Sequence, residues 1–541
     1  MKQTILTTLR ENVNWEIKKD RDEFLEQIEG YIGRWEYDLP NLRDIFKPEE
    51  IELLLSDSID YWTDDEAYFA GKEFIIFVVH SGYKDEPELD ENGKPSSHRT
   101  TPLHHPNMSK FGLWDTGVRK LFRIYDRFDV NYTDENGLTH FHVACMTGIF
   151  EVVLKFLEHG QDPNCLVTKT GNSPLHLALK YGHIYVIKLL LERDADPHVA
   201  NKKGRTPLHV LCKAPWDGST AEIFFKICAE KNRTIEVNAQ DNLGNTPLHL
   251  ALHLGNDKAA EFVLRRSADP NLPNEDGSTP LHIISKRDDG CNDNDDFLKL
   301  FFKINEENHQ LVQIDAKDKS GQTPLQLAVS NFKLDVVEIL LDRGADLFNF
   351  VFPNESQFDE KIQVWLKETW HDFKMELASQ SLSIVELLEK RGYELKRSDV
   401  LTIMAILAKH ALFCKPEHLE FCRSNEDFLS KAQKLDMNPS LSLYDLIRLR
   451  PEEATKLVTY TDYFKLTSSG KLYTLSKDEN QVCELQLFEK LSRGFFCRWA
   501  LDPFLQLTHN QLPILCCEMI INNLMNEDLC NICLTSAGGS S

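Results

Sequence analysis

The tetrapeptide Thr-Pro-Leu-His recurs through the middle of this chain at a nearly constant spacing. Perfect, variant and degenerate copies begin at Thr101, Thr139, Ser173, Thr206, Thr246, Thr279 and Thr323. Consecutive copies lie 33 to 44 residues apart, and the shortest spacings are 33 and 34. A period of about 20 to 50 residues marks a chain that repeats one small unit, and such a unit buries its apolar face only against its neighbours. We therefore expect a stack of similar units rather than one central core.

Each copy carries the signals of a turn followed by two short helices. In the copy over residues 242–274, Gly244 is free to adopt a positive φ in the turn. Thr246 can cap the first helix, and Pro247 suits its first position because no N–H is needed there. Apolar residues fill that helix, Gly255 breaks it, and a second helix carries an inward apolar stripe.

The period and the anchor together resemble the ankyrin repeat. This resemblance implies an all-α solenoid of helix-turn-helix repeats over residues 98–351, about seven in number with the first degenerate, flanked by helical N-terminal and C-terminal domains. Ankyrin proteins use the anchor histidine as an internal hydrogen-bond link, so the resemblance favours a structural role for it over metal binding or acid–base chemistry. The histidines at this position are His142, His176, His209, His249 and His282.

Two repeats contain extra residues, around 213–220 and around 286–296. The segments that follow match each other, since Phe-Phe-Lys-Ile begins at both Phe224 and Phe301. Alternation of ordinary and long repeats therefore suggests duplication of a two-repeat unit. Extra residues in a solenoid form loops on one face, often the binding face. The second insertion is rich in Asp but lacks the spacing and the closing Glu of a Ca²⁺ loop, which favours a solvated loop.

The flanking segments are helical by pattern and lack the anchor. Residues 1–97 are acidic, and we expect a helical cap on the solenoid whose last part, residues 85–97, is a linker rich in Gly, Pro and charge. Beyond the repeats we expect a helical connector at residues 352–437, a further domain at 438–535 and a flexible Ser/Gly-rich tail at 536–541.

The segment Ser442-Leu443-Tyr444-Asp445-Leu446 resembles the opening of a PRANC domain. This domain ends ankyrin-repeat proteins of poxviruses, some intracellular bacteria and hymenopteran insects. The segment from Tyr132 to Cys145 is most similar to the hymenopteran group. The resemblance implies a PRANC domain over residues 438–535.

The end of a PRANC domain is similar to an F-box, the helical module that binds the Skp-type adaptor of SCF ubiquitin ligases. Leu512-Pro513 matches the opening of the box, whereas Glu518 lies farther from it than the family's acidic residue and the chain stops before a third box helix. Apolar residues at helical spacing also predict one stripe on a helix. The members of the stripe are Leu512, Leu515, Met519, Ile520 and Leu524. The adaptor-binding candidates are Leu512, Pro513, Leu515, Ile520, Leu524, Asp528 and Leu529.

Charge and composition weigh against several other functions. The formal net charge is −24 over 541 residues, which disfavours binding to nucleic acid or to anionic membrane surfaces. No apolar stretch approaches the roughly 20 residues that span a bilayer, and we find no signal-peptide core near the N-terminus. The 13 cysteines are odd in number and scattered, so we expect reduced thiols in the cytoplasm or nucleus. The sequence lacks phosphate-binding loops and catalytic motifs, so we expect neither enzyme activity nor a cofactor.

Four cysteines near the C-terminus offer a zinc-site alternative. Cys530 and Cys533 have the spacing of zinc ligands. The adjacent Cys516 and Cys517 chelate less well than a spaced pair, and all four lie in apolar helical sequence, where a free Cys is a small buried residue. We favour the packing interpretation and expect no metal site.

We therefore expect a protein-interaction scaffold. The leading hypothesis is a substrate-recruiting subunit of a cullin-type ubiquitin ligase, which holds a client protein on the ankyrin face and a Skp-type adaptor on the C-terminal box. The alternatives are an ankyrin inhibitor that sequesters a transcription factor or another signalling protein without ligase recruitment, and an enzyme with an unrecognised centre between residues 352 and 440. The client-binding candidates, which lie beside anchors or in an insertion, are Tyr181, Lys202, Trp216, Asn242 and His253.

Overall fold

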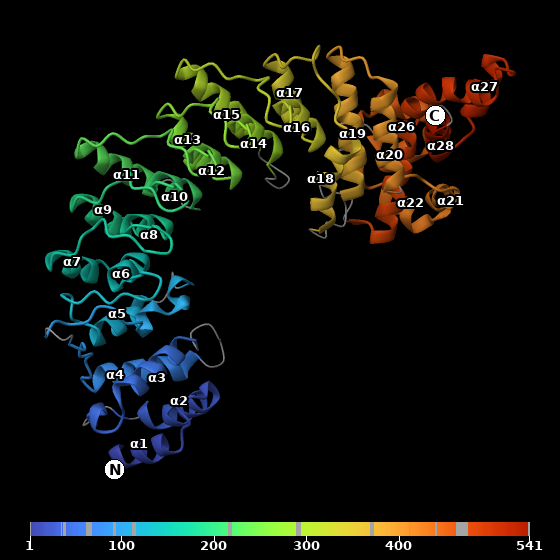
Figure 1. Ribbon diagram of the computed structural model, residues 1–541. Helices are drawn as coiled ribbons and strands as arrows, with labels where there is room; N and C mark the ends of the chain where they lie inside the picture. The colour runs from blue at the N-terminus through green and yellow to red at the C-terminus, as the bar shows by residue number, and fades with distance from the viewer. Residues whose placement is uncertain are drawn as a thin grey trace. The chain divides into compact units, whose positions relative to one another are not determined.

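The computed structural model describes most of the chain as helices, with one short pair of strands (Figure 1). The described residues are 2–33, 35, 39–60, 68–89, 93–110, 115–214, 219–287, 294–367, 373–410, 412–438, 441–460, 462 and 474–538. The chain divides into two compact units, Met1–Glu275 and Asp276–Ser541, and each is described by itself.

Helices form the start of the first unit, as expected. They are α1 (Lys2–Glu11), α2 (Lys18–Ile32), a 3-10 turn η1 (Leu42–Asp44), α3 (Pro48–Asp60) and α4 (Tyr68–His80). Leu25 of α2 and Leu54 of α3 are fully buried, and the two helices pack on each other. Between the same helices, the Arg21 guanidinium pairs with the Asp57 carboxylate at 2.6 Å in a largely buried position. A buried pair of this kind costs more to break than to keep, because removing one partner leaves an uncompensated charge.

The predicted linker at residues 85–97 is bonded to the repeats at both of its ends, while most of the described residues between them are exposed. Asp85 is buried; its backbone N–H donates to the Ile124 carbonyl at 3.0 Å and its carboxylate accepts from the Tyr132 hydroxyl at 2.5 Å. The Ser97 carbonyl accepts from the Thr133 N–H at 2.7 Å. Asp85 and Ser97, which the composition places in a linker, thus form hydrogen bonds with backbone and side-chain groups next to the repeats.

Four pairs of antiparallel helices follow within the first unit and stack side by side (Figure 1). They are α6 (His140–Thr147) with α7 (Phe150–Glu158), α8 (Pro174–Lys180) with α9 (Ile184–Glu192), α10 (Pro207–Lys213) with α11 (Ser219–Glu230), and α12 (Pro247–His253) with α13 (Asp257–Leu264). The first helices α6, α8, α10 and α12 pack on one another in order, and α9 packs on α7 and α11. The first helices are almost wholly buried; in α12, Leu248, Ala251 and Leu252 are 0% exposed. Each repeat therefore has its core in the contact with its neighbours.

The degenerate copy at Thr101 keeps the anchor and loses most of the first helix. Among the residues of this copy described before α5 (Asp115–Ile124), the helical turns are the 3-10 turns η3 (Pro102–His104) and η4 (Pro106–Lys110). The His104 Nε2 still reaches the Tyr132 carbonyl at 3.2 Å. The anchor chemistry therefore persists where the helix does not.

Glycine is required where the turn of one repeat touches the next. Gly204 has φ +72°, and a Cβ there would lie 2.3 Å from the Asn242 side-chain oxygen and 2.7 Å from the Asn242 nitrogen. The backbone bond from the Asn242 N–H to the Lys203 carbonyl, at 2.9 Å, holds the two turns together. Both the positive φ and the close approach exclude a side chain at Gly204.

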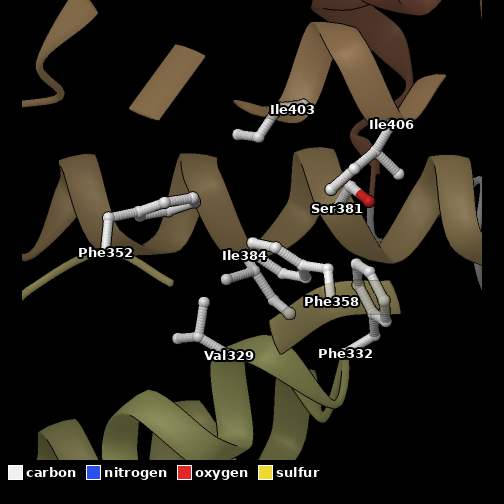
Figure 2. A pocket seen from close by; sticks show the side chains of 8 residues that line it. All are labelled: Val329, Phe332, Phe352, Phe358, Ser381, Ile384, Ile403 and Ile406. Carbon is white, nitrogen blue, oxygen red and sulfur yellow. The ribbon is translucent and has the colours of Figure 1, made fainter. Parts of the chain in front are cut away.

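The second unit begins with two further repeats and continues into three long helices. The repeats are α14 (Pro280–Lys286) with α15 (Asn294–Glu307), and α16 (Pro324–Ser330) with α17 (Leu334–Asp342). The helices after them are α18 (Glu355–Lys367), α19 (Phe373–Lys390) and α20 (Arg397–Lys409). They pack directly on the last repeat around a small apolar pocket, where Phe332 meets Phe358 and Ile384 (Figure 2). The expected connector is thus helical and is packed against the solenoid by its own apolar side chains.

A long helix organises the C-terminal part of the second unit. This helix, α26 (Lys477–Leu507), packs on α19 and on several shorter elements. The shorter elements that precede it in the chain, of which α21 and α24 pack on it, are α21 (Pro416–Ser424), α22 (Glu426–Ala432), the antiparallel strands β1 (Asp436–Asn438) and β2 (Leu441–Ser442), α23 (Leu443–Arg448) and α24 (Pro451–Leu457). Two helices follow it, α27 (Ile514–Ile521) and α28 (Asn526–Gly538), and α28 extends into the segment expected as a tail. Among the residues described, no helix combines the length and apolar character needed to cross a membrane.

Candidate binding surfaces

The anchor histidines link consecutive repeats, which confirms the structural interpretation. The His176 Nδ1 accepts from the Ser173 backbone N–H at 3.2 Å, so the ring proton lies on Nε2, which donates to the Arg205 carbonyl at 2.9 Å. The same bond to the following repeat is made by His142 (Cys165 carbonyl, 3.1 Å), His209 (Asn245 carbonyl, 3.0 Å) and His282 (Gln322 carbonyl, 3.1 Å). Both ring nitrogens are used, so these imidazoles do not line a binding site.

Burial keeps these histidines neutral. Desolvation lowers the pKa of His142 and of His176 to about 4, and lowers the pKa of His209 and His282 as well. At the last anchor Gln326 takes the same place: its Oε1 accepts from the Thr323 N–H at 2.8 Å and its Nε2 donates to the Val351 carbonyl at 2.9 Å. The link requires one acceptor and one donor at fixed positions, and it does not require a titratable group.

Two of the predicted client-binding residues lie together at the turn tips of the first unit. Lys202 and Asn242 are both exposed, and the Asn242 side-chain amide donates to the Lys202 carbonyl at 2.9 Å. The Asn242 side chain therefore supports the contact between the two turns. The Lys202 side chain takes no part in this bond, which uses only its backbone carbonyl. Of the two, Lys202 is the better candidate for contact with a client.

Tyr181 and His253 lie at the other end of the first helices. Tyr181 follows α8, is half-buried, and has its ring stacked on His183 at 6.4 Å, while the Lys180 ammonium lies 3.0 Å from its hydroxyl. His253 ends α12 and is exposed. The seven-residue helix α12 is about 10 Å long. The turn tips lie at one end of the first helices and Tyr181 and His253 at the other end, so both groups border the surface of these helices. Trp216 lies outside the described residues.

The sequence interpretation missed exposed apolar side chains beside these candidates. Leu243, next to Asn242 at a turn tip, is 57% exposed, and Leu254, next to His253, is 49% exposed. An apolar residue inside the polar turn Asn242-Leu243-Gly244 is the signal that would have found Leu243. Both ends of α12 therefore have an exposed apolar side chain next to a polar one, and this mixture is typical of a protein interaction surface.

A second candidate surface lies on α27. The exposed apolar side chains on this helix and directly before it are Leu512, Pro513, Ile514, Leu515, Met519 and Ile520, which we call the α27 surface. Leu515 is 73% exposed, Met519 68% and Ile514 59%. Within the described part of the second unit nothing covers these side chains. An apolar patch of this kind usually marks a contact with another molecule.

The predicted stripe is wrong at its last member, because α27 ends before Leu524, whereas the helix expected around Asp528 and Leu529 forms as α28. Residues 522–525 make a turn between α27 and α28. Leu524 lies in this turn and is half-buried, and Leu529 lies in α28 and is 0% exposed. Asp528 is exposed, and its carboxylate accepts from the Met525 N–H at 3.0 Å, which caps α28. Leu529 therefore belongs to the core and not to a contact surface.

A buried polar cluster holds the α27–α28 turn on α26. Asn526 is fully buried; its N–H donates to the Glu489 carboxyl at 2.8 Å and its side-chain amide donates to the Ser492 hydroxyl at 2.9 Å. Arg493 donates to the Ile521 carbonyl at 2.8 Å. Burial raises the pKa of Glu489 to about 7. Together with the buried Cys517 and Ile521, these bonds fix α27 while its other side stays exposed.

The C-terminal cysteines pack as the sequence interpretation favoured. Cys517 is buried, whereas the adjacent Cys516 is exposed. The Cys530 thiol donates to the Met404 carbonyl at 3.5 Å and the Cys533 thiol to the Trp499 carbonyl at 3.4 Å. Burial raises the pKa of Cys530 to about 12 and that of Cys533 to about 11. These thiols are protonated and point to different helices.

Comparison with known families matches the repeat region. The profile described as Ankyrin repeats (3 copies) matches residues 115–201, 193–274 and 263–349. Together with the stacked helix pairs, this establishes an all-α fold that contains an ankyrin solenoid. The family is in general a non-enzymatic interaction module.

Similar proteins match less than half of this chain. Transient receptor potential cation channel subfamily A member 1 of Homo sapiens is 30% identical over 245 residues, 44% of this chain and 20% of that protein. The Drosophila melanogaster protein of the same name is 32% identical over 33% of this chain and 14% of its own length. Neurogenic locus notch homolog protein 1 of Danio rerio is 32% identical over 29% of this chain and 7% of that protein. The chain thus spans a fifth or less of these relatives, and what it shares with them supports a role in protein–protein interaction.

Proposed function

We propose that this chain recruits a client protein to a cullin-type ubiquitin ligase. The client binds the turn tips and first-helix ends of the ankyrin repeats, and a Skp-type adaptor binds the α27 surface. The observation that carries the proposal is the exposure of that surface on a helix whose opposite side is firmly packed. The proposal places the chain in the cytoplasm or nucleus, where its many free thiols stay reduced.

The choice of an adaptor as the partner rests on the F-box resemblance of the segment from Leu512-Pro513 onward. Leu512, Pro513, Leu515 and Ile520 are all exposed and available for such a contact. The PRANC domain, its boundaries at 438–535 and the hymenopteran grouping are part of this proposal. The chain itself need not modify either partner chemically. Its two binding surfaces on one scaffold raise the local concentration of the client at the ligase.

The client side of the proposal rests on mixed polar and apolar exposure near the anchors. Lys202, Leu243 and Leu254 supply one exposed cation and two exposed apolar groups. Tyr181 adds a preorganised ring, because stacking on His183 already restricts it. Aromatic residues held in this way contribute strongly to interfaces at a low entropic cost.

Co-purification of the tagged full-length chain with a Skp-type adaptor tests the proposal. Leu515→Asp places a charge in the middle of the α27 surface without touching the core, and we expect loss of the adaptor. The matched control is Leu311→Asp, since Leu311 is 85% exposed and lies in the loop after α15. Full adaptor recovery with Leu515→Asp, or none with the wild type, would contradict the ligase role. Leu524→Asp is less informative because its half-buried position mixes folding with binding.

Sequestration of the client without a ligase is the second candidate function. It is favoured by the burial of Leu529 and the partial burial of Leu524, which remove two of the predicted adaptor contacts from the surface. A chain that retains its client and recovers no adaptor in the same experiment would support this function.

A further inference from the structure

The two copies of the two-repeat unit, each a long repeat followed by an ordinary one, offer an internal comparison, because their equivalent residues lie 77 positions apart. Phe225 corresponds to Phe302, Ala229 to Glu306 and Arg266 to Arg343. In the second unit the Arg343 guanidinium lies 4.7 Å over the Phe302 ring and pairs with the Glu306 carboxylate. The long repeat therefore supplies, from α15, both the ring and the anion that the arginine after α17 in the next repeat contacts.

The first unit keeps the arginine and the ring but lacks the anion. The Arg266 guanidinium lies 4.3 Å over the Phe225 ring and 3.6 Å over the Phe262 ring, and donates to the Phe262 carbonyl at 3.1 Å. Ala229 stands where the other repeat has Glu306. Among the residues described in this unit, no carboxylate forms an ion pair with Arg266.

Arg266 borders an open groove along α11 and the segment that follows it. Apolar side chains of Ile223, Phe225, Ile235 and Val237 line the groove together with Ala229. Lys226 adds an exposed cation, and Arg233 is held in place by the Asp194 carboxylate at 2.8 Å. Glu222 lies on the rim and its charge is felt by Arg266, although burial has the larger effect and lowers the pKa of the guanidinium.

We propose that this groove binds a partner-protein segment in which an Asp or Glu side chain stands next to an apolar side chain. The carboxylate takes the place beside Arg266 that Glu306 takes beside Arg343, and the apolar neighbour packs on Phe225 and Ile235. The proposal does not depend on the ligase role. None of the residues proposed above to contact the client lines this groove, which is built from a second helix and the loop after it.

The guanidinium is prepared for such a ligand. Two aromatic faces fix its plane, so little side-chain entropy is lost when a carboxylate binds its remaining N–H groups. A charge-assisted bond of this kind is stronger than a neutral one. Lys226 adds an exposed positive charge to the lining of the groove, whereas the chain as a whole carries −24, so an acidic segment is directed to this groove rather than to the surface in general.

A pair of substitutions at one position tests the proposal. Ala229→Glu supplies the anion that the second unit already has, and Ala229→Gln has nearly the same size without the charge. Ala229 is exposed on α11, so both variants should fold like the wild type, which circular dichroism checks. The probe is a fluorescein-labelled heptapeptide in which glutamate alternates with leucine and phenylalanine, measured by fluorescence polarisation on the full chain.

We expect the peptide to bind the wild type and Ala229→Gln within about threefold of each other, and to bind Ala229→Glu and Arg266→Gln at least about tenfold more weakly. A peptide with glutamine in place of glutamate should lose affinity by a similar factor. Equal binding to Ala229→Glu and Ala229→Gln would overturn the proposal. Absence of binding to the wild type at millimolar peptide would also overturn it.

Discussion

Acid should weaken the repeat stack through its anchor histidines, and His176→Gln should remove part of that effect. Gln326 already occupies the equivalent position in α16 and makes both anchor hydrogen bonds. The substitution therefore keeps the acceptor for the Ser173 N–H and the donor to the Arg205 carbonyl, and removes only the ability to take up a proton. At pH 7.5 we expect a change in the free energy of unfolding of about 1 kcal/mol or less.

The size of the effect at low pH follows from the two pKa values. The imidazole has an ordinary pKa of 6.5, and burial lowers the pKa of His176 in the folded chain to about 4. A group whose pKa is lowered by folding adds stability above its unfolded pKa, and that stability is lost as the pH falls towards the folded value. At pH 5 the unfolded imidazole is protonated and the folded one is largely not, so the wild type loses about 2 kcal/mol through this residue.

Urea unfolding of the full chain at pH 7.5 and pH 5, followed by circular dichroism, measures the difference. The loss of stability between the two pH values should be smaller in His176→Gln by about 2 kcal/mol. His198→Gln is the matched control, because that imidazole is exposed in the same repeat region. An identical pH dependence in wild type and His176→Gln would mean that the anchor imidazole is not held neutral by burial, and the reasoning would fail.

Three further predictions concern stability. Leu248 is fully buried in α12, so Leu248→Asp should lower the free energy of unfolding by several kcal/mol. It should also raise amide hydrogen exchange in the neighbouring helices α10 and α13. A rise in exchange confined to α12 would contradict the shared core. Gly204→Ala should lower stability more than Gly160→Ala in urea unfolding, since both have positive φ and only Gly204 also faces close contacts; equal losses would rule out the contact at the tip. The pKa of Glu489 is raised by folding from 4.5 to about 7, so its protonation stabilises the C-terminal bundle below pH 4.5 and this contribution, on the order of 3 kcal/mol, is lost as the pH rises through 7. Glu489→Gln should therefore abolish that part of the pH dependence in urea unfolding, and an unchanged pH profile would refute it.

The repeat architecture was predictable because its determinants are local and recur. Thr or Ser before Pro-Leu-His caps a short helix, and the same capping geometry appears at Ser173 and Thr246. The glycine in each turn predicted a positive φ, which Gly244 adopts at +70°. These signals lie within a few residues of one another, so no knowledge of distant contacts was needed.

The remaining features depend on contacts between residues far apart in the sequence. Asp85 looked like part of a linker by composition, because only the fold brings Tyr132 to its carboxylate. The break between α27 and α28 rests on Asn526, whose burial against Glu489 has no signature in a short apolar segment. The domain boundaries and the predicted client and adaptor contacts stay predictions.

The two copies of the two-repeat unit show which positions of this architecture tolerate substitution. The caps Thr246 and Thr323 have the same role, and His249 and Gln326 each accept a hydrogen bond from the backbone N–H of their cap. These positions stay alike because altering a buried link destabilises two repeats at once. Ala229 and Glu306 differ on exposed second helices, where a substitution alters little in the core. One such difference separates an arginine that pairs with a carboxylate of the preceding long repeat from an arginine that faces an open groove. Binding specificity in this chain should therefore be sought at exposed positions where equivalent residues of the two long repeats differ in charge, rather than at the recurring anchors.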